Sequence, residues 1–142
     1  MRGGRLFGLF GRRYVLPQAV ADALQQVFAE SVATVIVIEH SRYARAHRGM
    51  CATTRPNRIL LAISGAEFIA RPELLLHEYF HVLRQWRTGR LTRWRYVLES
   101  ARCGYWANRY EREAREFTDA TVERYSALMR HDVTVPARCH RS

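Results

Sequence analysis

The alternation of apolar and polar positions predicts a helix followed by strands in the first half of the chain. Apolar residues recur at helical spacing over residues 17–31, and the proline at position 17 suits the first turn of a helix. Residues 33–39 are rich in β-branched side chains, which is typical of a buried strand. Two further apolar stretches, residues 50–54 and 57–64, are separated by a proline-containing break and predict a β-hairpin.

The second half of the chain predicts three helices. Residues 71–89 carry apolar side chains around most of a helical circumference, with a proline near the start and a glycine at the end. A helix of this kind belongs in the core of a protein. A further helix is predicted from about residue 92 up to a break at Gly104, and a last long helix covers residues 105–129.

These elements predict an α+β fold in a single compact domain. The domain spans residues 16–130 and contains a small antiparallel sheet, a buried central helix and further helices downstream. Residues 1–15 are expected to form a flexible basic arm, residues 40–49 a loop, and residues 131–142 a flexible tail. The length of 142 residues fits one domain, and no apolar run is long enough for a transmembrane segment.

The basic composition points to anionic partners only weakly. The formal net charge is +10, but all 23 basic residues are arginine and they are spread along the whole chain. Nucleic-acid-binding domains usually gather their basic residues on one patch or stripe, so no specific nucleic acid is expected. A basic protein associated with nucleic acid or membranes stays open as an alternative. Three cysteines without a CxxC pair, Cys51, Cys103 and Cys139, favour reduced thiols and a cytoplasmic location.

The motif HEYFH within the central helix carries the candidate chemistry. His77 and His81 are four residues apart, so they lie on one face of a helix and can share one metal ion. Glu78 is turned by about 100° from His77, where it can reach a water on that ion but not easily the ion itself. This HExxH arrangement is typical of a catalytic zinc site with two histidine ligands and a glutamate as general base. Buried ionisable side chains are costly without partners, and a metal supplies one.

A catalytic zinc ion needs a third protein ligand, which should come from a downstream helix. The candidates are Glu99, Glu111, Glu113 and Glu116, and most of them would lie on a solvated, charged helix face. Two tyrosines, Tyr105 and Tyr110, are candidates for stabilising the oxyanion of an amide under attack, with packing in the core or at an interface as the alternative role of each.

The segment LLLHEYFHVLRQW followed by NRYEREA resembles the gluzincin metallopeptidases. The strand and hairpin upstream, together with this helix, resemble domain of unknown function 4157, a metallopeptidase domain of bacterial proteins. Some members of that family are linked to contractile injection systems and polymorphic toxins. The resemblance covers about residues 16–129 and implies a zincin-like fold.

The resemblance also implies roles for individual residues. By the motif, His77 and His81 are zinc ligands, Glu78 is the general base and Glu111 is the third ligand, three residues before a small alanine. The chain departs from the family at Arg115, where many gluzincins carry an aspartate or asparagine that orients a ligand histidine. Either another residue orients that histidine here, or the site is tuned differently.

The expected function is therefore zinc-dependent hydrolysis of peptide bonds. Glu78 would activate the water on the zinc ion, and a peptide or protein substrate would pair along the edge of the sheet beside the site. Two alternatives stay open: a zinc-binding module without catalysis, structural or associated with a secretion system or toxin, and the basic protein described above. A secretion-system association would involve export by a non-classical route.

Overall fold

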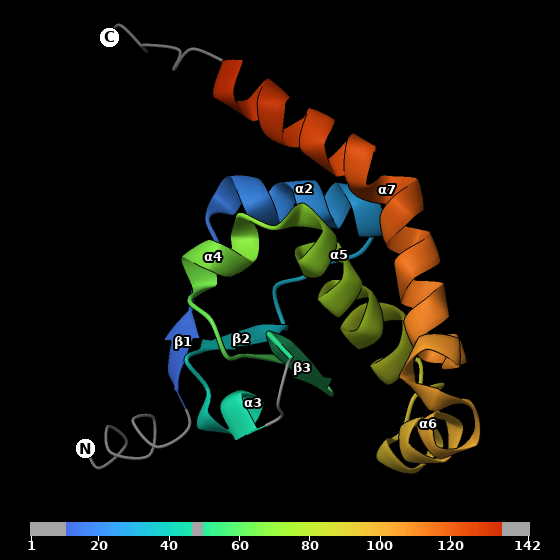
Figure 1. Ribbon diagram of the computed structural model, residues 1–142. Helices are drawn as coiled ribbons and strands as arrows, with labels where there is room; N and C mark the ends of the chain where they lie inside the picture. Colours follow the sequence, from blue (N-terminus) through green and yellow to red (C-terminus); the bar gives the residue numbers. More distant parts are fainter. Residues whose placement is uncertain (1–10, 47–49, 135–142) are drawn as a thin grey trace, which may run out of the picture.

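The computed structural model describes residues 11–46 and 50–134, and residues 1–10, 47–49 and 135–142 lie outside the described part. The described chain combines a small four-stranded sheet with several helices (Figure 1). The strands are β1 (Arg12–Tyr14), β2 (Ile36–Glu39), β3 (Ala52–Arg55) and β4 (Arg58–Leu61). The helices are α2 (Gln18–Phe28), α3 (Arg42–Ala46), α4 (Gly65–Ile69), α5 (Pro72–Phe80), the π-helix η1 (His81–Trp86), α6 (Arg93–Ala107) and α7 (Arg109–Thr134).

The sheet is mixed, which corrects the expectation of an antiparallel sheet. Its strand order is β1-β2-β4-β3, with β2 and β4 parallel and the two outer pairs antiparallel. The chain leaves β2 through α3, runs along the edge as β3 and returns as β4 between β3 and β2. The connection through α3 reverses the chain direction before β3, and the hairpin reverses it again. Strand β4 therefore runs in the same direction as β2. The α+β class and the hairpin itself are confirmed.

Several predicted boundaries are wrong, and in the first two cases tertiary contacts order a segment of weak local signal. The predicted arm includes β1, which pairs with β2. The predicted loop over residues 40–49 includes α3, whose backbone packs against β4. Helix α7 ends at Thr134, so the first residues of the predicted tail are helical. The rest of the tail lies outside the described residues.

A short helix that periodicity did not predict, α4, leads the chain from the sheet into α5. Ser64 caps it: the serine hydroxyl accepts a hydrogen bond from the Glu67 backbone N–H, and the Glu67 carboxylate accepts one from the Ser64 backbone. The N–H of Gly65 donates to the buried carboxylate of Glu39 at 2.7 Å. A Cβ at Gly65 would lie 2.1 Å from the Tyr14 ring, so only glycine fits this contact.

The hydrophobic core lies between one face of the sheet and a layer formed by α2, α5 and α7 (Figure 1). Phe117 of α7 stacks on Phe28 of α2 and packs at a tilt against Phe80 of α5, with ring centroids 4.9 Å apart in both pairs. Alternate strand residues point into this core, among them Val37, Ile59, Leu61 and Ala52. Helix α5 is thereby clamped between the sheet and α7, which holds the HExxH motif in a fixed place.

The helix that carries the motif changes type in the middle of it. Residues Pro72–Phe80 are α-helical, and the next six residues, His81–Trp86, form a π-helix, where the Arg87 N–H bonds to the Val82 carbonyl five residues before it. The chain then turns at Gly89, with φ +71°, which confirms the expected stop. Single π turns inside helices are rare and often lie at functional sites.

Helix α6 is separated from the core. It contains no buried residue and bends at Gly104, whose φ is +77°, so the predicted break is confirmed. Trp94 and Trp106 are the most exposed of its aromatic side chains. Among the described helices, none has the length and apolar character needed to cross a lipid bilayer.

Candidate metal centre

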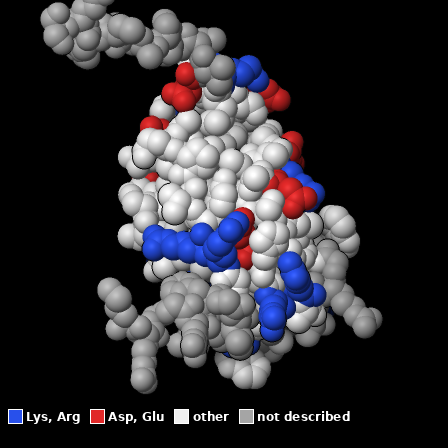
Figure 2. Space-filling view, turned by 90° about the vertical axis from the view of Figure 1, so that its left-hand side faces the viewer, with Lys and Arg blue, Asp and Glu red and all other residues white. Residues whose placement is uncertain are grey.

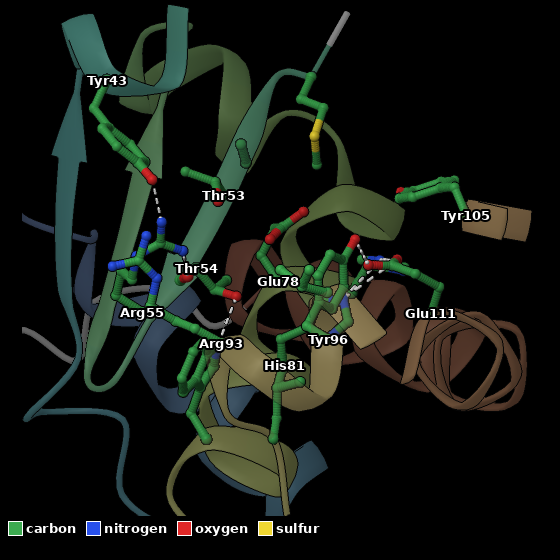
Figure 3. A pocket seen from close by; sticks show the side chains of 16 residues that line it. Tyr43, Thr53, Thr54, Arg55, Glu78, His81, Arg93, Tyr96, Tyr105 and Glu111 are labelled. Carbon is green, nitrogen blue, oxygen red and sulfur yellow. Dashed lines mark hydrogen bonds and ion pairs between the residues drawn. The ribbon is translucent and has the colours of Figure 1, made fainter. Parts of the chain in front are cut away.

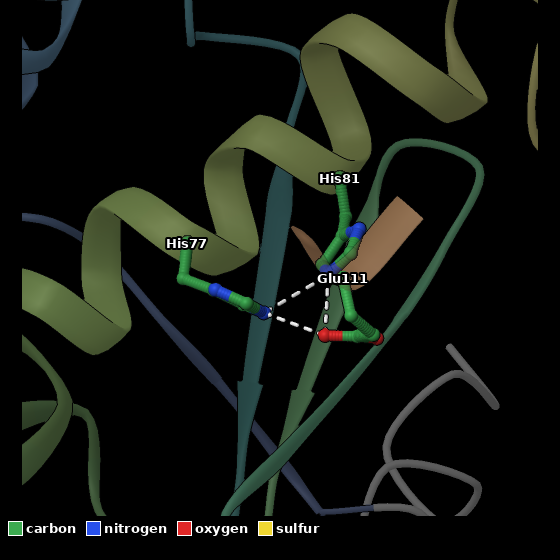
Figure 4. A group of neighbouring side chains, drawn as sticks. All are labelled: His77, His81 and Glu111. Carbon is green, nitrogen blue, oxygen red and sulfur yellow. Dashed lines mark hydrogen bonds and ion pairs between the residues drawn. The ribbon is translucent and has the colours of Figure 1, made fainter. Parts of the chain in front are cut away.

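The structure brings together His77, His81 and Glu111 (Figure 4). The Nε2 atom of His77 lies 2.9 Å from Oε2 of Glu111 and 3.1 Å from Nε2 of His81, and the His81–Glu111 contact is 3.5 Å. The histidines come from consecutive turns of the α5–η1 helix, and Glu111 comes from the first turn of α7, which packs against α5. These three side chains form a group that could hold a metal ion.

The two histidines stabilise the ionised form of the Glu111 carboxylate. Burial favours the neutral carboxyl, but the hydrogen bonds from His77 and His81 outweigh burial and lower the pKa of Glu111 well below its usual range. Burial likewise favours the neutral form of His81, yet Glu111 and Glu78 outweigh it and raise the pKa of His81. A buried carboxylate converging with two imidazoles is the donor set that divalent metal ions take from proteins.

Glu78 lies beside the three side chains without joining them. Its side chain is buried, and Figure 3 shows its carboxylate pointing into the cavity next to the cluster. Burial raises the pKa of Glu78, opposed in part by the nearby histidines His81 and His77. A carboxylate with a raised pKa holds a proton more readily, which suits a group that accepts and returns one.

Gln85 orients His81 and is a residue that the sequence did not single out. Its Oε1 lies 2.6 Å from Nδ1 of His81, and because an amide oxygen only accepts, the imidazole proton belongs on Nδ1. When His81 is protonated, its Nε2 donates to Glu111; when His81 is neutral, the form that binds a metal ion, its Nε2 lone pair faces His77 and Glu111. The amide nitrogen of Gln85 is held in turn by the Tyr110 carbonyl at 3.0 Å and by Glu113 at 3.2 Å.

Gln85 contacts His81, whereas Arg115, at the position where the gluzincin resemblance led us to expect an orienting residue, does not contact the cluster in any hydrogen bond of the described residues. Arg115 points elsewhere: its guanidinium donates to the Trp106 carbonyl at 2.7 Å and lies over the Trp106 ring. The carboxamide comes from the same helix as the histidine it orients, four residues after it and within the π-helical segment. The departure at residue 115 therefore leaves His81 with a partner.

Tyr96 is a second residue of the site that the sequence placed only among apolar helix positions. Its hydroxyl donates to Oε1 of Glu111 at 3.0 Å, so one carboxylate oxygen faces the tyrosine and the other faces the histidines. Burial, with the Glu111 charge added, raises the pKa of Tyr96, which keeps the phenol protonated as a donor. No local pattern indicates this role, because the contact joins two separate helices.

The other candidate glutamates lie away from the histidines. Glu113 bonds to Gln85 and pairs with Arg90 at 2.9 Å. Glu116 lies 4.0 Å from Arg112 on the outer side of α7. Glu99 lies beside the thiol of Cys103 on α6. Among the residues that the structure describes, only Glu111 completes a group with the two histidines.

The two candidate oxyanion tyrosines have different surroundings. Tyr105 lines the cavity beside the cluster, and burial together with the Glu111 charge raises its pKa to about 12. Tyr110 is buried, and its hydroxyl donates to the Arg90 carbonyl at 3.2 Å and accepts from Arg109 at 2.9 Å. Tyr110 does not line this cavity, so of the two only Tyr105 could reach a bound substrate.

The cavity beside the cluster has a volume of about 260 Å³ and runs along the edge strand β3 (Figure 3). All four residues of β3 line it, together with His77, His81 and Glu78. Trp86 ties the end of the π-helix to this strand, since its indole N–H donates to the Thr54 hydroxyl at 3.0 Å. Within the described residues β3 pairs only with β4, so its outer edge lies unpaired next to a group that could hold a metal ion.

Replacing Gln85 by leucine is expected to weaken metal binding by about 10- to 100-fold, since partners that orient metal-bound histidines are typically worth that much. Without the amide, His81 is free to rotate and to move its proton to Nε2. Zinc affinity would be measured by competition with a chromophoric chelator. Gln25→Leu, on the exposed side of α2, is the matched control. Equal affinities for the two variants would contradict the role of Gln85, and circular dichroism checks that both fold.

The resemblance to metallopeptidases was carried by the motif and by the residues that follow it. The geometry of the described chain adds a close contact among His77, His81 and Glu111 and a buried Glu78 beside them. The chain matches no protein-family model, and no match was found among curated proteins or among solved structures.

Proposed function

We propose that this protein is a zinc-dependent metallopeptidase, with His77, His81 and Glu111 as the zinc ligands and Glu78 as the general base. The observation that carries the proposal is the spacing of the three ligand atoms, 2.9, 3.1 and 3.5 Å apart. Zinc–ligand bonds of about 2.0–2.1 Å in a tetrahedron place neighbouring ligand atoms about 3.3 Å apart. The spacing of the three atoms supports their use as three of four zinc ligands, which would leave one position for water or substrate.

A bound zinc ion would supply the Lewis acidity that makes a water nucleophilic near neutral pH and polarises the substrate carbonyl. Glu78 accepts the proton that this attacking water loses as its oxygen bonds to the carbonyl carbon. The same carboxyl returns the proton to the amide nitrogen when the carbon–nitrogen bond breaks. Its raised pKa supports this role, because the protonated form must persist long enough to act as an acid.

The remaining side chains orient these groups. Tyr96 holds one oxygen of Glu111 so that the other faces the histidines. Gln85 fixes the tautomer of His81. Tyr105, at the cavity wall, donates its hydroxyl to the carbonyl oxygen as negative charge develops there. The free edge of β3 pairs with an extended peptide, which presents its carbonyl carbon to the site.

The purified chain is expected to cleave members of a broad peptide library, to stop after treatment with a zinc chelator and to recover when zinc is restored. Mass spectrometry of the digest identifies the cleaved bonds. Protein that holds zinc but cleaves nothing in the library would favour the zinc-binding module without catalysis. Protein that takes up no metal would end the zinc proposal, since the affinity of such donor sets for zinc is high.

A further inference from the structure

Two arginines lie at one end of the metal cavity, which is the cavity beside His77, His81 and Glu111. Arg55 at the end of β3 and Arg93 at the start of α6 line that cavity, together with Tyr43 of α3 (Figure 3). The same three residues also line a second cavity, on the opposite face of the sheet. The two cavities are therefore neighbours that meet at this pair of guanidinium groups.

The second cavity combines further positive charge with an apolar floor. Its floor is formed by side chains from the sheet face that the core helices leave uncovered, which are Ile36, Ile38 and Leu60. Arg13 and Arg58 complete its rim. Figure 2, viewed from the side of β1 and α4, shows basic side chains gathered over the lower half of the described surface, with acidic side chains mainly above them.

Four arginines thus line the two cavities, namely Arg13, Arg55, Arg58 and Arg93. None of the four pairs with a carboxylate among the described residues, although other arginines of the chain do. Arg12, Arg84, Arg87, Arg90 and Arg112 each have an acidic partner. Arg55 is held only by neutral groups: it donates to the Thr54 carbonyl at 2.9 Å and to the Tyr43 hydroxyl, and it lies over the Tyr43 ring. These contacts hold the Arg55 guanidinium in place but do not neutralise its positive charge.

The strand register adds an independent sign that an anion belongs here. Arg55 and Arg58 are direct partners in the β3–β4 pair, so their side chains leave the same face of the sheet side by side. Like charges directly opposite each other destabilise a strand pair. A carboxylate bound between them would remove this repulsion and accept paired hydrogen bonds from a guanidinium.

Given the proposed peptidase function, on which this step rests, we propose that the substrate is an acidic peptide. A peptide extended along β3 would run within the cavity toward Arg55 at the end of the strand, and the three steps from Ala52 to Arg55 cover about 10 Å at the usual rise per strand residue. An aspartate or glutamate about three to four residues from the cleaved bond would then reach Arg55, with Arg58 and Arg93 lining the same cavity. An apolar side chain beyond it would lie on the floor of Ile36, Ile38 and Leu60.

The test measures binding separately from cleavage. Zinc-loaded Glu78→Gln protein is titrated into fluorescein-labelled peptides that differ only at one position, carrying Glu, Gln or Lys three or four residues from the bond cut by wild type. If wild type cuts nothing, the same substitution is moved along an extended peptide of fixed sequence. Fluorescence anisotropy is expected to show binding of the Glu peptide at least about tenfold tighter than the Gln peptide, the range for a hydrogen-bonded ionic contact.

Charge-reversal variants of Arg55 and Arg93 test whether these two residues cause the preference for the Glu peptide. Arg55→Glu and Arg93→Glu, each in the Glu78→Gln background, are expected to lose the preference for Glu and to favour the Lys peptide. Arg124→Glu changes the net charge equally but lies on the exposed side of α7, where its guanidinium bonds to the Gln26 carbonyl. Arg124→Glu is expected to keep the preference for Glu.

Several results would overturn the inference. Equal binding of the three peptides would do so, and so would an equal loss of preference in Arg124→Glu and Arg55→Glu, which would reduce the effect to net charge. Displacement of the acidic peptide by anionic lipid vesicles or an oligonucleotide, dependent on Arg55, would show a surface for another polyanion. Cleavage by wild type without any acidic preference would overturn this inference but leave the peptidase standing. Preference for Glu without cleavage would support the acidic ligand and end the peptidase proposal.

Discussion

Zinc is expected to be lost from His77→Ala, His81→Ala and Glu111→Ala, with affinity falling by more than about 100-fold in each. Outer partners of zinc ligands alone are worth about 10- to 100-fold, and removal of a ligand leaves only two protein donors. In the part of the chain that the structure describes, these three side chains form the only group of this kind, with ligand atoms within 4.8 Å of one another. Elemental analysis after purification without chelator gives the zinc content, with about one equivalent expected in wild type.

The glutamates nearby provide controls for this experiment. Glu113→Ala removes a carboxylate from the same helix turn, but Glu113 contacts Arg90 and Gln85 and not the histidines, so its loss is expected to lower zinc affinity far less than the loss of Glu111. Glu99→Ala tests the rival third ligand on α6 directly. Both variants are expected to retain zinc. Retention of zinc by Glu111→Ala, combined with its loss from Glu99→Ala, would refute the ligand assignment and move the third ligand to α6.

Glu78→Gln is expected to keep its zinc and its fold but to lose about 10²- to 10⁴-fold in kcat/KM, the usual contribution of a general acid–base group. The amide matches the carboxylate in size and carries no charge that must be buried, so the melting temperature should not fall. Cleavage of a fluorogenic peptide and the zinc content are measured on the same preparation.

The Glu78→Gln variant distinguishes a general base from a zinc ligand. Zinc loss from Glu78→Gln equal to that from His77→Ala would mean that Glu78 has been given the wrong role. Full activity with zinc bound would mean that another group accepts the proton. A matched control is Glu73→Gln, one turn earlier on α5, which should leave both zinc content and cleavage unchanged.

Sequence pattern and structure agree where the interaction is local. The i, i+4 spacing of His77 and His81 predicted two imidazoles on one helix face, and the structure has their Nε2 atoms 3.1 Å apart. The hairpin of β3 and β4 followed from two apolar stretches around a proline. The contact of Glu111 with the histidines is not local, because Glu111 lies 34 residues after His77. Glu111 was expected there because of the resemblance to a family motif and not because of a local pattern.

Contacts between distant segments were beyond the reach of local pattern. The parallel pairing of β2 with β4 depends on where β3 folds, because strand order is decided by packing over the whole sheet. The backbone of residues 12–14 has little apolar signal and becomes a strand only because β2 offers an unpaired edge. Helix α3 likewise forms in a polar stretch that packs under β4.

The sequence by itself determined the chemistry that the central helix can offer: two imidazoles on one face, a carboxylate beside them and apolar residues that bury the helix. These are properties of helical periodicity, which acts over a few residues. Only the tertiary structure decided which glutamate meets the histidines, that Gln85 contacts His81 and Tyr96 contacts Glu111, and that arginines without a carboxylate partner among the described residues border the cavity. Such contacts depend on how α6, α7 and the sheet pack together, and packing is a property of the whole chain.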